Sequence, residues 1–140
     1  MLSTDFPVVG GLYQLTDDWS VSLPGEFKRR IEDGDLVLWS PALTLWIAVW
    51  KNDQGASKES RLDSIKKAMS SDAEEIKTSA SATLLRLSYR LREEEDAVAA
   101  VYGFAVGERG QVEMAIYPEA ETDVNAAQAI LQSLTESKVA

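Results

Sequence analysis

The segment from Leu43 to Trp50 restricts the fold more than any other part of this sequence. Leu43, Leu45, Ile47 and Val49 alternate along it with Thr44, Trp46, Ala48 and Trp50. Because successive side chains of a β-strand point to opposite faces, both faces of such a strand would be largely apolar. The run is also far shorter than the roughly 20 residues that a membrane-spanning helix needs. The pattern therefore predicts a central strand with both faces covered.

A hairpin is predicted just before this strand. Asp33-Gly34 separates the run Phe27–Ile31 from the run Leu36–Trp39, and Asp-Gly between two apolar runs is a strong turn signal. The spacing of Phe27 and Ile31 also suits one face of a helix, but that helix would lack a good cap. We therefore favour the hairpin, preceded by a short half-buried strand over Trp19–Leu23.

Three more strands form a predicted meander in the second half of the chain. Apolar residues alternate with polar or small ones over 85–91, 97–106 and 112–116, with turns between them. The middle strand carries small residues such as Gly103 and Ala105 on one side. These residues would let a helix or another backbone approach the sheet closely.

Two amphipathic helices complete the expected fold. Apolar residues at spacings of three and four predict one helix over about 57–71, capped by Ser57, and another that begins at Thr122 or Asp123. The predicted fold class is α+β, a mostly antiparallel six- or seven-stranded sheet flanked by two helices, in the order β-β-β-β-α-β-β-β-α. No linker or repeat divides residues 1–140, so we expect a single domain. Two helices of this length can cover one face fully or both faces partly, so some apolar sheet surface could be left for a partner.

Composition excludes several functions. The sequence contains no Cys and no His, which removes disulfides, Cys/His metal sites, Cys nucleophiles and catalytic triads that use imidazole. We therefore expect no enzyme activity, no metal and no cofactor.

The charge balance concerns partners and location. The chain has 14 Lys and Arg against 23 Asp and Glu, a net charge of −9. Such a chain is not attracted to phosphate backbones or anionic lipid, so neither nucleic acid nor a membrane is expected as a partner. The first residues lack a basic stretch followed by an apolar one, so the cytoplasm is the expected location.

The tryptophans are the first candidate site. Trp39, Trp46 and Trp50 lie close together on two adjacent predicted strands, and Trp46 and Trp50 share a face. They could fill the core beneath a helix, as buried aromatic residues commonly do. Alternatively, they could form an aromatic patch on an uncovered face that binds a partner or a second copy of the chain.

The second candidate site is a stripe of arginines. Arg86, Arg90 and Arg92 fall on the polar side of one predicted strand. Glu26, Glu32, Glu113 or the acidic run 93–96 could pair with them across strands. The alternative is an anion-binding site in which Arg86 and Arg90 supply the donors.

Acidic pairs in predicted turns are weaker candidates. Asp17 with Asp18, Asp33 with Asp35, and the run 93–96 could suggest acid-base chemistry or a cation site. Carboxylates in turns are solvated and titrate normally, and none of these has the spacing of a calcium-binding loop. We therefore assign them no catalytic or metal-binding role.

One family resemblance stands out. The segment Trp19–Phe27 is a strand that closes in Leu-Pro and a glycine turn, and it resembles the opening of PsbP/Mog1/DcrB-like domains. The later order of hairpin, helix, antiparallel strands and terminal helix is similar too, so the resemblance spans roughly Leu12–Leu134. It implies an antiparallel sheet flanked by helices, and binding of proteins rather than catalysis. The chain is most similar to the cytoplasmic bacterial branch, such as the type VI secretion adaptor proteins that shelter effector helices on a paired, concave sheet.

These observations together predict a non-catalytic cytoplasmic protein-binding or adaptor domain. It would act as a homodimer and engage another protein, such as a secreted effector or toxin, through apolar sheet surface. Two alternatives remain open. One is an acidic inhibitor or immunity-type protein for a basic partner, and the other is a small domain that binds an anionic ligand.

Overall fold

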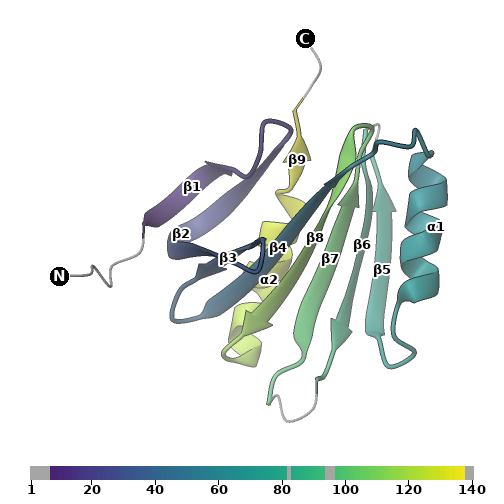
Figure 1. The fold of residues 1–140 in the computed structure, drawn as a ribbon. Coiled ribbons are helices and arrows are strands. Elements are labelled where there is room, and N and C mark those ends of the chain that lie inside the picture. The colour runs from purple at the N-terminus through teal and green to yellow at the C-terminus, as the bar shows by residue number, and fades with distance from the viewer. Residues whose placement is uncertain (1–6, 82, 94–96, 138–140) are drawn as a thin grey trace.

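The computed structural model describes residues 7–81, 83–93 and 97–137 as one sheet with two α-helices. The elements are β1 (Val8–Gln14), β2 (Trp19–Glu32), β3 (Asp35–Trp39), β4 (Leu43–Lys51), α1 (Lys58–Ala68), β5 (Glu74–Ala80), β6 (Leu85–Leu91), β7 (Ala100–Val106), β8 (Gly110–Pro118), the 3₁₀ helix η1 (Glu121–Asp123), α2 (Val124–Gln132) and β9 (Thr135–Glu136). The predicted α+β class is confirmed. Figure 1 shows the sheet, with α1 beside β5 and β6 and with α2 and β9 toward the β1–β2 end.

The sheet is antiparallel at every pairing of the described strands. Its order is β1-β2-β3-β4-β8-β7-β6-β5, and β9 pairs with the start of β2. Asp33 and Gly34 connect β2 to β3 with φ angles of 51° and 88°, so the predicted hairpin turn is present. β4 pairs with β8 along its whole length and joins the two halves of the sheet. The central position predicted for Leu43–Trp50 is therefore confirmed.

One face of the sheet packs against α2. Ala127, Ile130 and Leu131 of this helix lie in the main core with the buried residues of β2, β4, β7 and β8. Gly103 of β7 lies directly beneath the helix, and a Cβ at this position would overlap the Leu131 side chain. The prediction that small residues on this strand admit a close neighbour is thus confirmed.

The opposite face packs against α1. Ser57 caps this helix, and its hydroxyl accepts a hydrogen bond from the Ser60 backbone nitrogen at 3.1 Å. Leu62 packs with Leu87 and Tyr89 in a second, smaller core cluster. The helix therefore begins where the sequence predicts, and it ends at Ala68.

The structure contains more strands than the six or seven predicted. β1, β5 and β9 are additional, whereas the two strands predicted over Trp19–Leu23 and Phe27–Ile31 form the single strand β2. β5 is fully exposed along its length and forms a sheet edge, so its sequence has no alternation of apolar and polar residues. β1 also lies at an edge and is interrupted by a register shift between Val9 and Gly11. Edge strands of this kind depend on backbone hydrogen bonds to a neighbouring strand. The alternation of apolar and polar residues therefore does not predict them.

A helix can span a membrane only if it is long and apolar enough. Across the part of the chain that the structure describes, no helix combines the length and the apolar character required to span a bilayer.

Candidate functional site

The three predicted tryptophans lie on one face of the sheet. In the register of the strands, Lys28 pairs with Trp39, Val37 with Trp46, and Trp46 with Ala115. Because strand partners share a face, Trp39, Trp46 and Trp50 point to the same side as α1. That helix packs mainly on β6 and β7, and Figure 1 shows it beside β5 and β6, away from β3. We call the part of this face formed by Trp39, Trp46, Ala48, Trp50 and Glu113 the tryptophan face.

The four tryptophans differ in burial. Trp19 is 1% exposed and belongs to the main core, whereas Trp50 is 47% exposed. Trp39 and Trp46 are half-buried, and the Arg30 guanidinium lies 4.9 Å from the centre of the Trp39 ring. The prediction that both faces of Leu43–Trp50 are covered is therefore wrong at the Trp50 end. The physical reason is that α1 packs mainly on β6 and β7, so β4 lies outside the main area that the helix covers.

Two carboxylates flank the centre of this face. Ala48 lies between Trp46 and Trp50 on β4, and its partner on β8 is Glu113. On the other side, Leu36 pairs with Ile47, which brings the preceding residue, Asp35, level with Ala48. Burial, followed by the negative charge of Asp35, raises the pKa of the half-buried Glu113 carboxyl. From the sequence pattern, Glu113 was predicted only as a partner for an arginine, and Asp35 only as a turn residue.

An aromatic row continues the face toward α1. The rings of Tyr89 and Tyr102 stack with centroids 5.3 Å apart, and Tyr89 and Phe104 stack at 6.3 Å. The Tyr102 hydroxyl donates a hydrogen bond to Glu93. Burial and this hydrogen bond raise the pKa of Tyr102 well above its ordinary range.

A groove is lined by both the aromatic row and α1. Its volume is about 670 Å³, and it runs from Trp50 and Glu113 over Tyr89 and Phe104 to Ile65 of α1. Arg61 lines the same groove, but its guanidinium donates hydrogen bonds to the carbonyl oxygens of Ala56, Gly107 and Gly110. The tryptophan face and the groove therefore form one continuous surface rich in aromatic residues.

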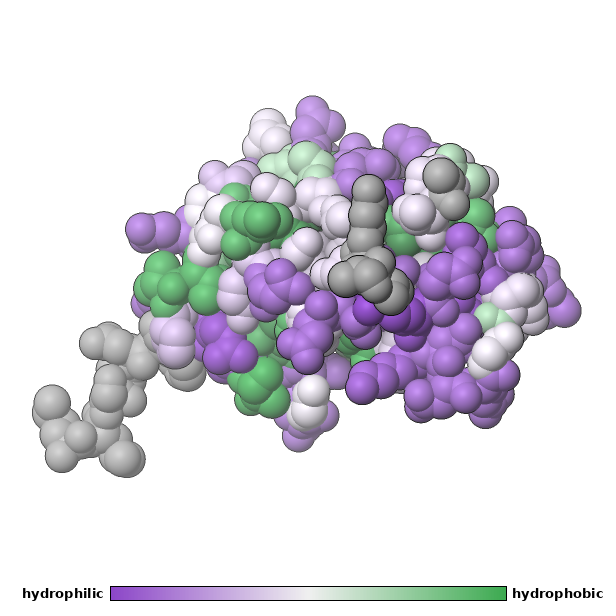
Figure 2. Space-filling model, turned by 90° about the horizontal axis from the view of Figure 1, so that it is seen from above, coloured by the Kyte–Doolittle hydropathy of each residue, from purple (hydrophilic) through white to green (hydrophobic). Residues whose placement is uncertain are grey.

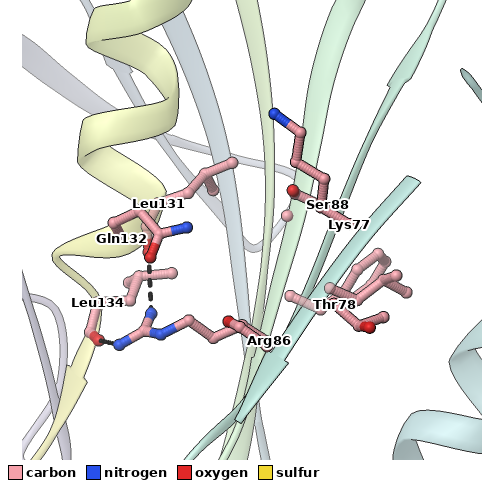
Figure 3. A pocket seen from close by; sticks show the side chains of 11 residues that line it. Lys77, Thr78, Arg86, Ser88, Leu131, Gln132 and Leu134 are labelled. Atoms are coloured by element: carbon pink, nitrogen blue, oxygen red, sulfur yellow. Dashed lines mark hydrogen bonds between the residues drawn. The ribbon is translucent and has the colours of Figure 1, made fainter. Parts of the chain in front are cut away.

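Arg86 lies on the other side of the sheet, beneath the end of α2. It donates hydrogen bonds to the carbonyl oxygens of Leu131 at 3.0 Å and Leu134 at 2.7 Å, as Figure 3 shows. The Leu131 carbonyl lies in the last turn of α2 and also accepts from the Leu134 backbone nitrogen at 3.3 Å, whereas Leu134 follows the helix. Burial lowers the pKa of Arg86. A pocket of about 350 Å³ beside it also contains Lys77, Ser88 and Gln132.

Arg90 is buried and donates hydrogen bonds to a different set of oxygens. It is 8% exposed, donates to both Glu121 carboxylate oxygens at 3.3 and 3.0 Å, and donates to the Ala99 carbonyl at 2.9 Å. Glu75 of β5 forms a further ion pair with it at 3.5 Å. The partners predicted for this residue are therefore wrong. Both actual carboxylates come from elements that long-range folding brings to β6.

The third arginine does not join the other two at one site. Arg92 donates to the Ala97 carbonyl at 2.8 Å. Together the arginines tie β6 to α2, to η1 and to the chain before β7. The structure thus gives Arg86, Arg90 and Arg92 separate protein oxygens to bind, rather than one shared cavity.

The acidic pairs in turns remain dispersed. Asp18 forms an ion pair with Arg109 at 2.9 Å, and residues 94–96 of the acidic run lie outside the described residues. Within the described ranges, no three acidic side chains gather in a way that could hold a metal ion.

Comparison with known proteins adds no relative. No protein-family model, no curated protein and no solved structure matches this chain. The resemblance to PsbP/Mog1/DcrB-like domains therefore stays a prediction.

Proposed function

We propose that this chain is a non-catalytic protein-binding or adaptor domain that engages its partner through the tryptophan face. The observation that carries the proposal is the position of Trp39, Trp46 and Trp50 on one face, away from the strands on which α1 mainly packs, with Trp50 about half exposed. Large aromatic side chains at the centre of a surface commonly supply most of the binding free energy of an interface. The lack of His and Cys in the sequence also favours binding over catalysis.

The partner is proposed to be another protein in the cytoplasm. The net charge of −9 argues against nucleic acid or an anionic membrane as the partner. If the resemblance to secretion adaptors holds, the chain is a homodimer and its partner is a secreted effector or toxin.

A photo-crosslinking experiment tests this proposal. Benzoylphenylalanine replaces Trp50 in one variant and Asp63, exposed on the solvent side of α1, in the control. We expect one protein species to crosslink from position 50 and not from position 63. That species, once purified, should bind the wild-type chain and should not bind the Trp39→Ala/Trp46→Ala variant. Crosslinking that is absent, or equal at the two positions, would overturn the proposal.

A second candidate is an acidic inhibitor or immunity-type protein for a basic partner. The observation that favours it is the pair of carboxylates, Asp35 and Glu113, on the tryptophan face of a chain with a net charge of −9. Such a protein would be steered electrostatically, so its association rate should fall steeply as the salt concentration rises. A rate that does not change with salt would argue against it.

The anion-binding alternative receives less support from the geometry. Arg86 and Arg90 already direct their donors to carbonyl and carboxylate oxygens of the chain itself.

A further inference from the structure

On the tryptophan face, Ala48 is the only residue of β4 between Trp46 and Trp50, and the surface over Ala48 is called the gap below. Trp46 and Trp50 lie on the same side of β4 with only Ala48 between them on that face. At about 3.3 Å per residue, their Cα atoms are about 13 Å apart along the strand. The only side chain between the two tryptophans on this face of β4 is therefore the methyl group of Ala48.

Carboxylates bound the same gap across the strands. Asp35 on β3 and Glu113 on β8 lie on either side of Ala48, each one strand away, so their Cα atoms are about 10 Å apart. Among the described residues, neither carboxylate has a cation or a hydrogen-bond donor as a partner. The two charges instead repel each other, which contributes to the raised pKa of Glu113.

The cationic side chains nearby are engaged elsewhere. Arg30 points to the same side of the sheet, but it forms an ion pair with Glu32 at 2.7 Å and lies over the Trp39 ring. Arg61 on the far side of the groove binds three backbone carbonyls. The gap thus combines aromatic walls, negative charge and no internal counter-ion within the described part of the chain.

We infer that the tryptophan face recognises an arginine or lysine side chain of the partner protein, seated over Ala48 between Trp46 and Trp50 and facing Asp35 and Glu113. This inference rests on the proposed function and names the chemistry of the partner's anchor. Aromatic faces attract cations, and a carboxylate that loses water gains most from a charged donor. The aliphatic stem of the anchor would pack on the indoles.

We expect a protein segment as the occupant because Trp50 and Glu113, which border the gap, also line a longer groove. The groove of about 670 Å³ continues from Trp50 and Glu113 to Phe104 and Ile65. An extended segment with its basic residue over Ala48 can place an apolar neighbour on these side chains. The net charge of −9 would attract such a basic segment from a distance.

The test uses a small probe on the full chain. N-acetyl-arginine methylamide is titrated into the labelled protein at constant ionic strength and followed by NMR, with the uncharged N-acetyl-norleucine methylamide as the control probe. We expect saturable shifts at the Trp50 indole and at Glu113 with the arginine probe, and much weaker shifts with the norleucine probe. The Glu113→Gln variant should bind the arginine probe about tenfold more weakly.

A matched variant separates a site from general attraction. Glu119→Gln makes the same change of charge at an exposed position beyond the end of β8, and it should bind the probe like the wild type. The inference is overturned if the two probes bind alike, if Glu113→Gln leaves the affinity unchanged, or if Glu119→Gln weakens binding equally.

The outcomes also separate this inference from the proposed function. A crosslinked partner found from position 50, together with arginine-probe binding that is indifferent to Glu113, would overturn the inference and leave the proposed function supported. Probe binding that requires Glu113, without any protein crosslinked from position 50, would support a cation site and overturn the proposed function.

Discussion

At the scale of single residues, Glu113 is the clearest case of a side chain whose ionised form destabilises the fold. It is half-buried, its neighbour across Ala48 is the carboxylate of Asp35, and both effects raise its pKa above the ordinary value of 4.5. The folded chain therefore binds this proton more tightly than the unfolded chain does. The corresponding stability is present below the ordinary pKa and is lost as the pH rises through the raised folded-state pKa.

The Glu113→Gln variant should accordingly be more stable than the wild type at neutral pH. The difference should shrink toward zero at a pH below the ordinary pKa of glutamate, where the wild-type carboxyl is protonated in both states. Urea unfolding at several pH values measures this effect, with Glu119→Gln as the control that should follow the wild type. A Glu113→Gln variant that is less stable at neutral pH would show that the carboxylate has a stabilising partner.

The contact of Gly103 with Leu131 is a second effect of a single residue. Gly103→Ala should destabilise the fold by about 1–3 kcal/mol, because its new methyl group would overlap the Leu131 side chain. Adding Leu131→Ala should recover part of that loss relative to Leu131→Ala alone, because the smaller side chain makes room. Gly25→Ala, where a Cβ would meet no atom within 4 Å, is the control. Equal thermal shifts for Gly103→Ala and Gly25→Ala would contradict this packing argument.

At the scale of elements, the end of α2 is held by a side chain from β6. Arg86 donates hydrogen bonds to the carbonyl of Leu131, in the last turn of the helix, and to that of Leu134, just after it. The main core cluster contains Leu131 and Leu134 as well. The end of α2 and the start of β9 therefore depend on a long-range hydrogen bond as well as on apolar packing.

Arg86→Leu should loosen this end of the molecule. Loss of two charged hydrogen bonds to buried carbonyls is expected to cost about 2–4 kcal/mol, reduced by the partial solvent access of the guanidinium. Amide hydrogen exchange should accelerate in α2 and β9 more than in β4 and β8. Arg92→Leu, at the exposed position just after the same strand, is the comparison. Uniform acceleration across all strands would indicate global destabilisation instead of a local role for Arg86.

At the scale of the whole molecule, the exposed apolar side chains are unevenly distributed. Exposed apolar residues Val8, Leu12 and Ile31 belong to β1 and β2, and Trp50 and Ile76 are the other large ones among the described residues. Figure 2 shows apolar side chains gathered toward the left of the view, on the side where Figure 1 places β1 and β2, and mostly hydrophilic side chains toward the right. Trp19 is buried and Trp50 is about half exposed, so tryptophan fluorescence can distinguish the core from the exposed surface.

Tryptophan fluorescence should therefore resolve two populations. Acrylamide should quench Trp50 readily and leave Trp19 protected, so Trp50→Phe should remove most of the quenchable signal. Light scattering on the same samples gives the oligomeric state. If the tryptophan face were the dimer interface, a concentrated dimer would protect Trp50. A dimer in which Trp50 remains quenchable would place the dimer contact elsewhere and leave the face open to a partner.

Features that depend on residues close together in the sequence could be predicted from it, whereas features that depend on distant residues could not. Alternation along Leu43–Trp50, the Asp33-Gly34 turn and the cap at Ser57 were readable because each depends on neighbours within a few residues. The sequence by itself therefore determined the α+β class, the central strand and the shared face of Trp46 and Trp50.

Tertiary structure alone decided what surrounds those residues. Only the pairing of β4 with both β3 and β8 brings Asp35 and Glu113 to either side of Ala48, and only the position of α1 leaves Trp50 uncovered. Arg90 likewise acquires Glu75 from an edge strand with no periodic signal. The physical reason is that strand pairing uses backbone groups common to every residue, so the choice of neighbour is made by the packing of the whole sheet.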